Sequence, residues 1–166
     1  MQGATAKMTR KCAHVASAFA CVFVLGFGPA PGTAHATGGL ACSIDDDNLK
    51  LDFNGVYSHS IPKIHAVGGE FQSKLPRTPK SLQQFALDSS DLLQQWWQDN
   101  DLKLLIYRET QGDDPFASVQ LVIQTNGTSN EELSYAGNYR LKLWGASDSG
   151  QTPVTAEGKV ACWDNQ

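Results

Sequence analysis

Residues 102–124 read LKLLIYRETQGDDPFASVQLVIQ, two apolar runs on either side of a polar segment. The first run, Leu102 to Arg108, is apolar on both faces of an extended chain, as in a central strand. Gln111 to Pro115 contains the Gly, Asp and Pro residues typical of turns. Val119, Leu121 and Ile123 then lie at every second position, between Ser118, Gln120, Val122 and Gln124, which is the period of a strand with one apolar face. The stretch predicts a β-hairpin.

The same alternation predicts further strands on both sides of this hairpin. The segment Leu49–Phe53 has leucine and phenylalanine at every second position, and Asn138–Trp144 places Tyr139, Leu141 and Leu143 inward. Shorter strands are expected at Glu70–Leu75 and Gly158–Trp163. Asn126-Gly127 is a preferred two-residue hairpin connection. We therefore interpret it as a turn, and not as part of a glycosylation acceptor with Thr128.

Two segments in the middle of the chain have helical signals. Thr78-Pro79 resembles an N-cap followed by proline at the first helical position. Asp88-Ser89-Ser90 supplies caps before Leu92–Trp97, whose apolar residues follow the i, i+1, i+4, i+5 pattern of an amphipathic helix. A helix would turn both Trp96 and Trp97 toward the core, whereas a strand would leave one indole outside.

Together these elements predict a mainly β fold. Several short strands separated by turns are typical of a small antiparallel β-sandwich or open barrel, here with one or two short helices inserted in the middle. We find no internal repeat, and the sequence contains no signal for a second folded domain.

The N-terminal part predicts export. Basic residues at positions 7, 10 and 11 precede an apolar run, Ala16–Phe27, and small residues follow at Ala34 and Ala36. This is the layout of a secretory signal peptide. The run is shorter than the roughly 20 residues of a membrane span, so stable membrane insertion is not expected. We predict a signal peptide at 1–36, cleavage near Ala36, and a single periplasmic or extracellular domain at 37–166.

Cysteine usage and charge are consistent with this prediction. Cleavage would remove Cys12 and Cys21 and leave Cys42 and Cys162, a pair expected to form a disulfide in an oxidising compartment. The remaining chain has ten Lys and Arg against 17 Asp and Glu, a net charge of −7. Such a chain lacks the basic stripe that nucleic-acid binding requires. The sequence does not decide the oligomeric state.

The strongest candidate for ligand binding combines cations with indoles. Arg140, Lys142 and Trp144 point outward from one predicted strand, and Lys159 and Trp163 from the next. If the strands pair, these side chains would form a shallow platform, since indole faces stack on sugar rings and cations hold anionic groups. The alternative is that both tryptophans only pack at strand ends.

Other candidate chemistry is less specific. His59 lies between Ser58 and Ser60, and His65 follows six residues later, but no Gly-x-Ser-x-Gly or His-Glu-x-x-His motif accompanies them. Asp45–Asn48 lacks the glycine of an EF-hand calcium loop and is interpreted as a solvated acidic turn. We expect neither a metal site nor a cofactor.

The residues thus favour an exported, non-enzymatic binding or accessory module that recognises a cell-envelope component, either a glycan or a protein. One alternative is a small envelope-acting hydrolase that uses carboxylates such as Asp52 or Glu70. Another is a secreted inhibitor or accessory protein of another enzyme, whose loop at Gln111–Pro115 or Gly145–Thr155 enters the partner's cleft.

Overall fold

The computed structural model describes residues 37–128, 134–145 and 152–165, all within one compact unit. The predicted signal peptide, residues 1–36, lies outside these ranges. Within them, no helix combines the length and apolar character that crossing a bilayer would require.

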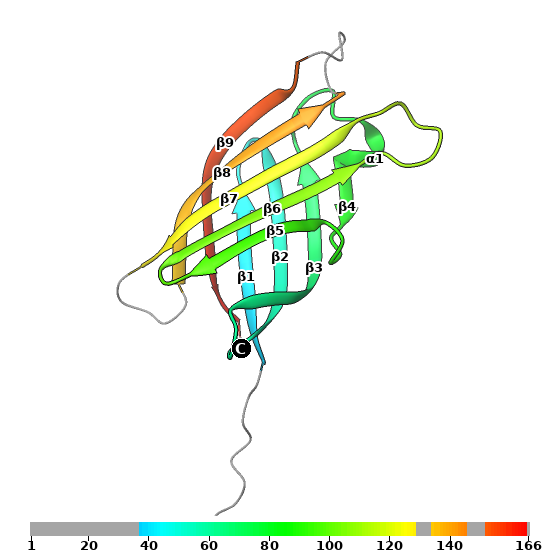
Figure 1. Cartoon of the computed structure of the whole chain (residues 1–166). Coiled ribbons are helices and arrows are strands. Elements are labelled where there is room, and N and C mark those ends of the chain that lie inside the picture. Colours follow the sequence, from blue (N-terminus) through cyan, green and yellow to red (C-terminus); the bar gives the residue numbers. More distant parts are fainter. Residues whose placement is uncertain (1–36, 129–133, 146–151, 166) are drawn as a thin grey trace, which may run out of the picture. The chain divides into compact units, whose positions relative to one another are not determined.

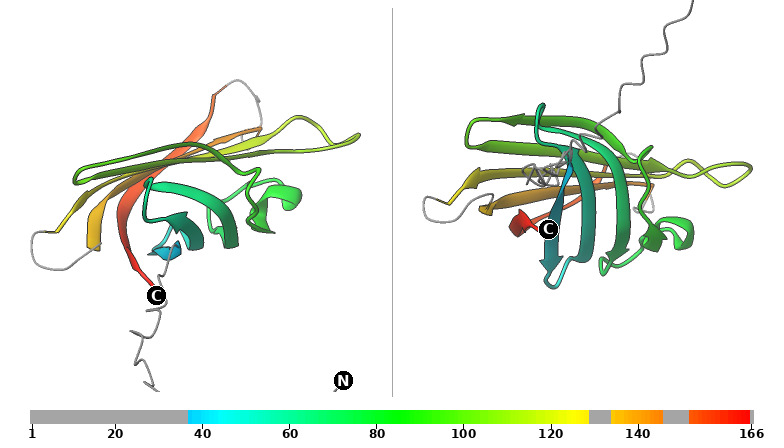
Figure 2. Two further views of the ribbon diagram at one scale, coloured as in Figure 1. Left: turned by 60° about the horizontal axis from the view of Figure 1, so that its bottom comes forward. Right: turned by 90° about the horizontal axis from the view of Figure 1, so that it is seen from below.

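The described residues form one antiparallel sheet of nine strands, with one short helix. In the sheet, strands that follow each other in the chain are neighbours, except that β1 pairs with β9 and that β4 and β5 occupy the two edges (Figure 1). The sheet curls into a half-barrel (Figure 2), which confirms the predicted mainly β fold. The elements are β1 (Thr37–Asp45), β2 (Leu49–Ser58), β3 (Lys63–Ser73), α1 (Lys80–Gln83), β4 (Gln84–Ala86), β5 (Leu92–Gln98), β6 (Asp101–Glu109), β7 (Ser118–Gly127), β8 (Ser134–Trp144) and β9 (Val154–Asp164).

The core lies on the inner face of the curled sheet. Along β2, buried and exposed residues alternate strictly from Leu49 to Tyr57, so one side of the strand faces the interior. The largest fully buried side chains include Phe53, Phe71 and Tyr139, which come from both halves of the sheet. Burying each large apolar side chain stabilises the fold by roughly 1.5–3 kcal/mol. The outer face is therefore left for polar side chains.

The predicted helix at Leu92–Trp97 is wrong, because these residues form strand β5. β5 pairs with β6 through a tight turn at which Asp99 adopts a left-handed conformation (φ 52°). The polar residues that resembled helix caps form a turn instead, in which the backbone N–H of Ser90 donates to Asp88. Trp96 is 56% exposed, whereas Trp97 packs against the core.

The other helical signal is confirmed, although the helix is short. α1 spans a single turn and buries Leu82. Pro79 and not Thr78 occupies the N-cap position. The Thr78 hydroxyl instead donates to the backbone carbonyl of Leu75, so it stabilises the turn before the helix.

The predicted disulfide between Cys42 and Cys162 is present. It joins β1 to β9, where the register covers only Leu40–Ser43 opposite Ala161–Asp164, the shortest seam between two long strands of the sheet. Cross-linking this seam ties the two ends of the domain together. The disulfide is consistent with a non-cytoplasmic location.

Two further elements differ from expectation. Asn126-Gly127 is not the hairpin turn, since both residues belong to β7 and Gly127 pairs with Tyr135. Strand β1 was not foreseen either, because its first residues, Thr37-Gly38-Gly39, carry no alternating apolar pattern. Backbone pairing with β2 over its whole length overrides this weak local preference.

Strand β3 pairs with β4 only over Glu70–Gln72. Nearer its start, side chains connect β3 to the edge strand β5. The backbone N–H of Ile64 donates to Oε1 of Gln95 (2.6 Å), and Nε2 of Gln95 donates back to the Ile64 carbonyl (2.9 Å). Nearby, the N–H of Val67 donates to the hydroxyl of Ser89 (3.0 Å). The Gln95 side chain thus satisfies the backbone N–H and carbonyl of Ile64, as a residue of a neighbouring strand would.

Candidate binding face

The outer face of β5–β9 carries a row of polar side chains that ends at an indole. The strand registers place Trp96 opposite Lys103, Lys103 opposite Gln124, Gln124 opposite Asn138, and Asn138 opposite Lys159. With neighbouring strands about 4.8 Å apart, the row is about 19 Å wide. Lys159 donates from Nζ to Oδ1 of Asn138 (2.8 Å). Stacking and hydrogen-bonding groups therefore share one surface.

The next row along the strands contains an ion pair. Leu105, Val122, Arg140 and Glu157 lie opposite one another on β6, β7, β8 and β9. Nε of Arg140 donates to Oε1 of Glu157 (2.7 Å), and both side chains are more than 60% exposed. An exposed pair of this kind contributes at most about 1 kcal/mol. Its main effect is to hold the guanidinium group in position.

A third row lies on the other side of Arg140. It places Tyr107 opposite Gln120, and Gln120 opposite Lys142. Lys142 forms no ion pair with any other residue in the described part of the chain. Burial, together with the hydrogen bond that its hydroxyl donates to Glu109, raises the pKa of Tyr107, so this phenol stays neutral.

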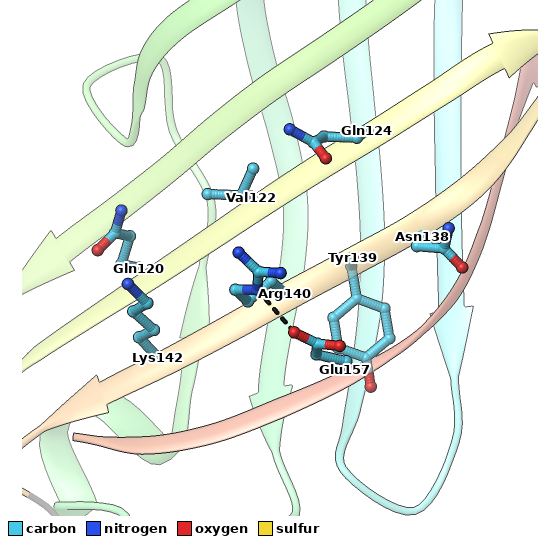
Figure 3. A pocket seen from close by; sticks show the side chains of 8 residues that line it. All are labelled: Gln120, Val122, Gln124, Asn138, Tyr139, Arg140, Lys142 and Glu157. Carbon is cyan, nitrogen blue, oxygen red and sulfur yellow. Dashed lines mark hydrogen bonds and ion pairs between the residues drawn. The ribbon is translucent and has the colours of Figure 1, made fainter.

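A shallow hollow of about 400 Å³ lies between these rows. Figure 3 shows Gln120 and Lys142 approaching each other on one side of it, with Arg140 between Val122 and Glu157. Its outer rim presents amide, guanidinium and ammonium donors beside one carboxylate. We call the outer-face residues of the three rows the platform: Trp96, Lys103, Leu105, Tyr107, Gln120, Val122, Gln124, Asn138, Arg140, Lys142, Glu157 and Lys159.

The structure brings together the three predicted cations but separates the two predicted indoles. Arg140, Lys142 and Lys159 all belong to the platform. Trp163 lies opposite Ser134, at the far end of β8 from Trp144, so about 33 Å of strand separates the two indoles. They are 37% and 40% exposed. The two indoles are therefore not neighbours: Trp144 lies two residues beyond Lys142 on the same face of β8, and Trp163 lies near the other end of the seam. Trp96 shares a row with one of the three cations, Lys159.

A cluster of aromatic side chains lies on the inner face of the sheet. Nε1 of Trp97 donates to the hydroxyl of Tyr135 (2.8 Å), and the Trp97 ring packs edge-on against Tyr57 and Tyr135. Tyr57 and Tyr135 are buried, and a small hollow of about 220 Å³ remains beside them. These contacts connect β2, β5 and β8, so the cluster is a packing element.

The acidic turn also has a structural role. The Asp46 carboxylate accepts hydrogen bonds from the backbone N–H groups of Asn48 and Leu49 and from the Tyr139 hydroxyl (2.5 Å). Burial opposes ionisation of Asp46, but these donors lower its pKa overall. Burial, followed by the hydrogen bond to Asp46, raises the pKa of Tyr139 to about 12. The turn is thereby anchored to β8.

The remaining candidates do not form enclosed sites. Asp52 and Glu70 lie opposite each other on β2 and β3, but both are exposed, and they accept hydrogen bonds from the amides of Asn54 and Gln84. His59 packs beside Tyr57. No group of three or more His, Cys, Asp or Glu side chains suited to a metal occurs among the described residues.

Of the two loops predicted to enter a partner's cleft, the structure describes one fully and the other only in part. Gln111–Pro115 is described, exposed, and connects β6 to β7. Most of Gly145–Thr155 lies outside the described residues. The Thr110 hydroxyl donates to the carbonyl of Pro115 (3.0 Å) and accepts from the N–H of Ala117 (3.0 Å), which fixes the base of the first loop.

An ion pair that the sequence analysis did not single out lies near the sheet edge. Arg108 donates from Nε and Nη2 to both oxygens of Asp91 (2.7 and 2.6 Å), and its guanidinium lies 4.3 Å from the centre of the Phe85 ring. Asp91 is only 3% exposed. The fork geometry and the aromatic contact are those of a structural pair that connects β6 to the turn between β4 and β5 and to Phe85 of β4.

Comparison with protein-family models, with curated proteins and with solved structures gives no match to this chain. Functional conclusions therefore depend on the geometry of the platform.

Proposed function

We propose that the protein is an exported, non-enzymatic binding module that recognises a cell-envelope saccharide on the platform. The observation that carries the proposal is the cross-strand row from Trp96 to Lys159. An exposed indole provides an apolar face for a sugar ring, and the amides of Gln124 and Asn138 donate to and accept from hydroxyl groups. The paired strands hold these groups side by side on the outer face of the curled sheet.

A protein partner, the other ligand class predicted from the sequence, has less support than a saccharide. A stable protein interface has a well-packed apolar centre, with aromatic residues gathered there and charged residues depleted. The platform has one exposed indole at its edge, while charges and amides surround the two aliphatic residues, Leu105 and Val122, at its centre. This composition suits a ligand that is itself covered with hydroxyl groups.

Export is part of the same proposal. It rests on the signal-peptide pattern of residues 1–36 and on the disulfide, which suits an oxidising compartment. An exported module would meet envelope polysaccharides directly. Fractionation of expressing cells would test the location, with the disulfide-bonded protein expected outside the cytoplasm.

Affinity gel electrophoresis tests the binding function. The purified, oxidised protein would be run through native gels that contain peptidoglycan fragments, dextran or polygalacturonate. We expect retardation in at least one gel, and we expect Trp96→Ala to reduce it at least tenfold in affinity, equivalent to about 1.4 kcal/mol. Trp163→Ala is the matched control, since Trp163 is an exposed indole opposite Ser134, outside the platform. Unchanged mobility of the wild-type protein in all three gels, or equal effects of the two variants, would overturn the proposal.

A further inference from the structure

We propose that the saccharide is acidic, and that the platform holds its carboxylate or phosphate groups through Arg140 and Lys142. The inference rests on the proposed function and names the class of ligand. It begins from a local excess of positive charge. The platform carries Lys103, Arg140, Lys142 and Lys159 against the carboxylate of Glu157. Two further carboxylates lie at its edge, where Asp101 contacts Lys103 and Glu109 accepts a hydrogen bond from Tyr107. Four cations against three carboxylates still give a positive balance, although the chain from residue 37 onward has a net charge of −7.

Lys142 is the central cation of this surface. It lines the hollow opposite Gln120 (Figure 3), and directly opposite residues of an antiparallel pair have Cβ atoms about 5 Å apart. An ammonium group and a primary amide at this distance can donate to the same oxyanion. Since Lys142 has no ion-pair partner among the described residues, binding an anion there breaks no existing ion pair.

Arg140 is oriented for the same task. Its pair with Glu157 uses Nε, and the terminal nitrogens lie on the side of β7 (Figure 3). Two parallel N–H groups of a guanidinium match the two oxygens of a carboxylate or phosphate. Arg140 and Lys142 are two residues apart on one strand, so their Cα atoms are about 6.7 Å apart on the same face. One anionic group of a sugar fits between them.

The outer cations extend this contact along a chain of sugars. Lys159 lies on β9 beyond Asn138, and Lys103 lies on β6 between Gln124 and Trp96. Their partners leave them accessible, because Lys159 bonds the neutral amide of Asn138 and Lys103 lies 3.3 Å from the exposed carboxylate of Asp101. A polyanionic saccharide that crosses the platform would meet a cation at each side of the hollow.

The test compares glycans that differ in charge. Affinity electrophoresis or calorimetry would use polygalacturonate, fully methyl-esterified polygalacturonate, phosphomannan and dextran as probes. We expect binding to polygalacturonate or phosphomannan, and the polymer that binds identifies the anionic group. We also expect affinity to fall at least tenfold with the methyl ester or in 0.5 M salt, as is typical of exposed charge contacts.

Variants then assign the effect to residues. Arg140→Gln and Lys142→Gln should each weaken binding of the acidic glycan about tenfold, because each removes one charge-assisted contact. Lys50→Gln is the matched control, since Lys50 is an exposed lysine on β2, outside the platform. Thermal denaturation would confirm that all three variants are folded.

The experiment distinguishes failure of the acidic-ligand proposal from failure of the saccharide-binding proposal. If the methyl ester binds as tightly as the acid and Trp96→Ala weakens both, the platform binds sugars but the acidic ligand class is wrong. If Lys50→Gln weakens binding as much as Lys142→Gln, the contact is general charge attraction and the site is wrong. If no glycan binds, both proposals are wrong.

Discussion

Trp96 and Trp97 are consecutive residues of β5 and lie on opposite faces of the sheet. Trp97 donates a hydrogen bond to Tyr135 on the inner face, and Trp96 lies opposite Lys103 on the outer face. This relationship separates a structural indole from a candidate binding indole at adjacent positions. It makes the pair a direct test of the fold and of the platform together.

Substitution of these residues should therefore have unequal effects on stability. Trp97→Ala should lower the free energy of unfolding by about 3 kcal/mol, because it removes a large aromatic side chain from the core and the partner of Tyr135. Trp96→Ala should cost less than about 1 kcal/mol, as is usual for an exposed side chain. Urea unfolding measures both values. Equal losses would show that β5 does not have the assigned faces.

Reduction of the disulfide should destabilise the protein strongly. Cys42 and Cys162 are separated by 120 positions in the sequence, and closing a loop of this size stabilises by about 4–5 kcal/mol in the chain-entropy model. Urea unfolding with and without a reducing agent gives the difference. The double variant Cys42→Ser/Cys162→Ser should behave like the reduced protein and should not respond to the agent. A loss under about 1 kcal/mol would mean that the β1–β9 seam needs no cross-link.

The buried pair of Arg108 and Asp91 should be more important to stability than the exposed pair on the platform. Asp91→Asn should cost about 3 kcal/mol, since it removes the buried carboxylate and leaves the guanidinium only the exposed Asp88, 3.3 Å away. Glu157→Gln, which breaks the exposed pair with Arg140, should cost at most about 1 kcal/mol. Denaturant titration of both variants checks the order. A reversed order would contradict the burial of Asp91.

Tyr139 should make stability fall at alkaline pH. Its pKa is raised from an ordinary value of 10.0 to about 12 in the fold, so the native state holds this proton more tightly than the unfolded chain does. The resulting stabilisation is complete below pH 10 and is lost as the pH rises from 10 through 12. Unfolding free energies measured between pH 8 and about pH 11 should decline less steeply in Tyr139→Phe. Parallel curves for the two proteins would exclude Tyr139 as the cause.

Alternation along single strands made much of this fold predictable. Leu49–Phe53, residues 119–123 and Asn138–Trp144 each repeat with a period of two, and all lie within strands of the structure. The same period placed Arg140 and Lys142 correctly on the outer face. The two cysteines could be paired because they are the only two beyond residue 36.

The errors have two physical origins. In Leu92–Trp97 the apolar spacing suits a helix, and pairing with β6, which depends on residues further along the chain, decides for a strand. The second origin is the register of the strands, because it depends on how two strands pair and not on the sequence of either one alone. The distance between Trp144 and Trp163, and the alignment of Trp96 with Lys103, follow from pairing that no single segment encodes.

The most direct test of the platform is nuclear magnetic resonance of the ¹⁵N-labelled, oxidised protein titrated with oligogalacturonate. The chain has four tryptophans, whose indole N–H signals report separately on Trp96, Trp97, Trp144 and Trp163. We predict that the Trp96 indole and the side-chain amides of Gln120, Gln124 and Asn138 shift with one common dissociation constant, while Trp97 and Trp163 stay in place. Shifts confined to Trp97 or Trp163, or no shift at saturating ligand, would contradict a saccharide-binding platform on the outer face of β5–β9.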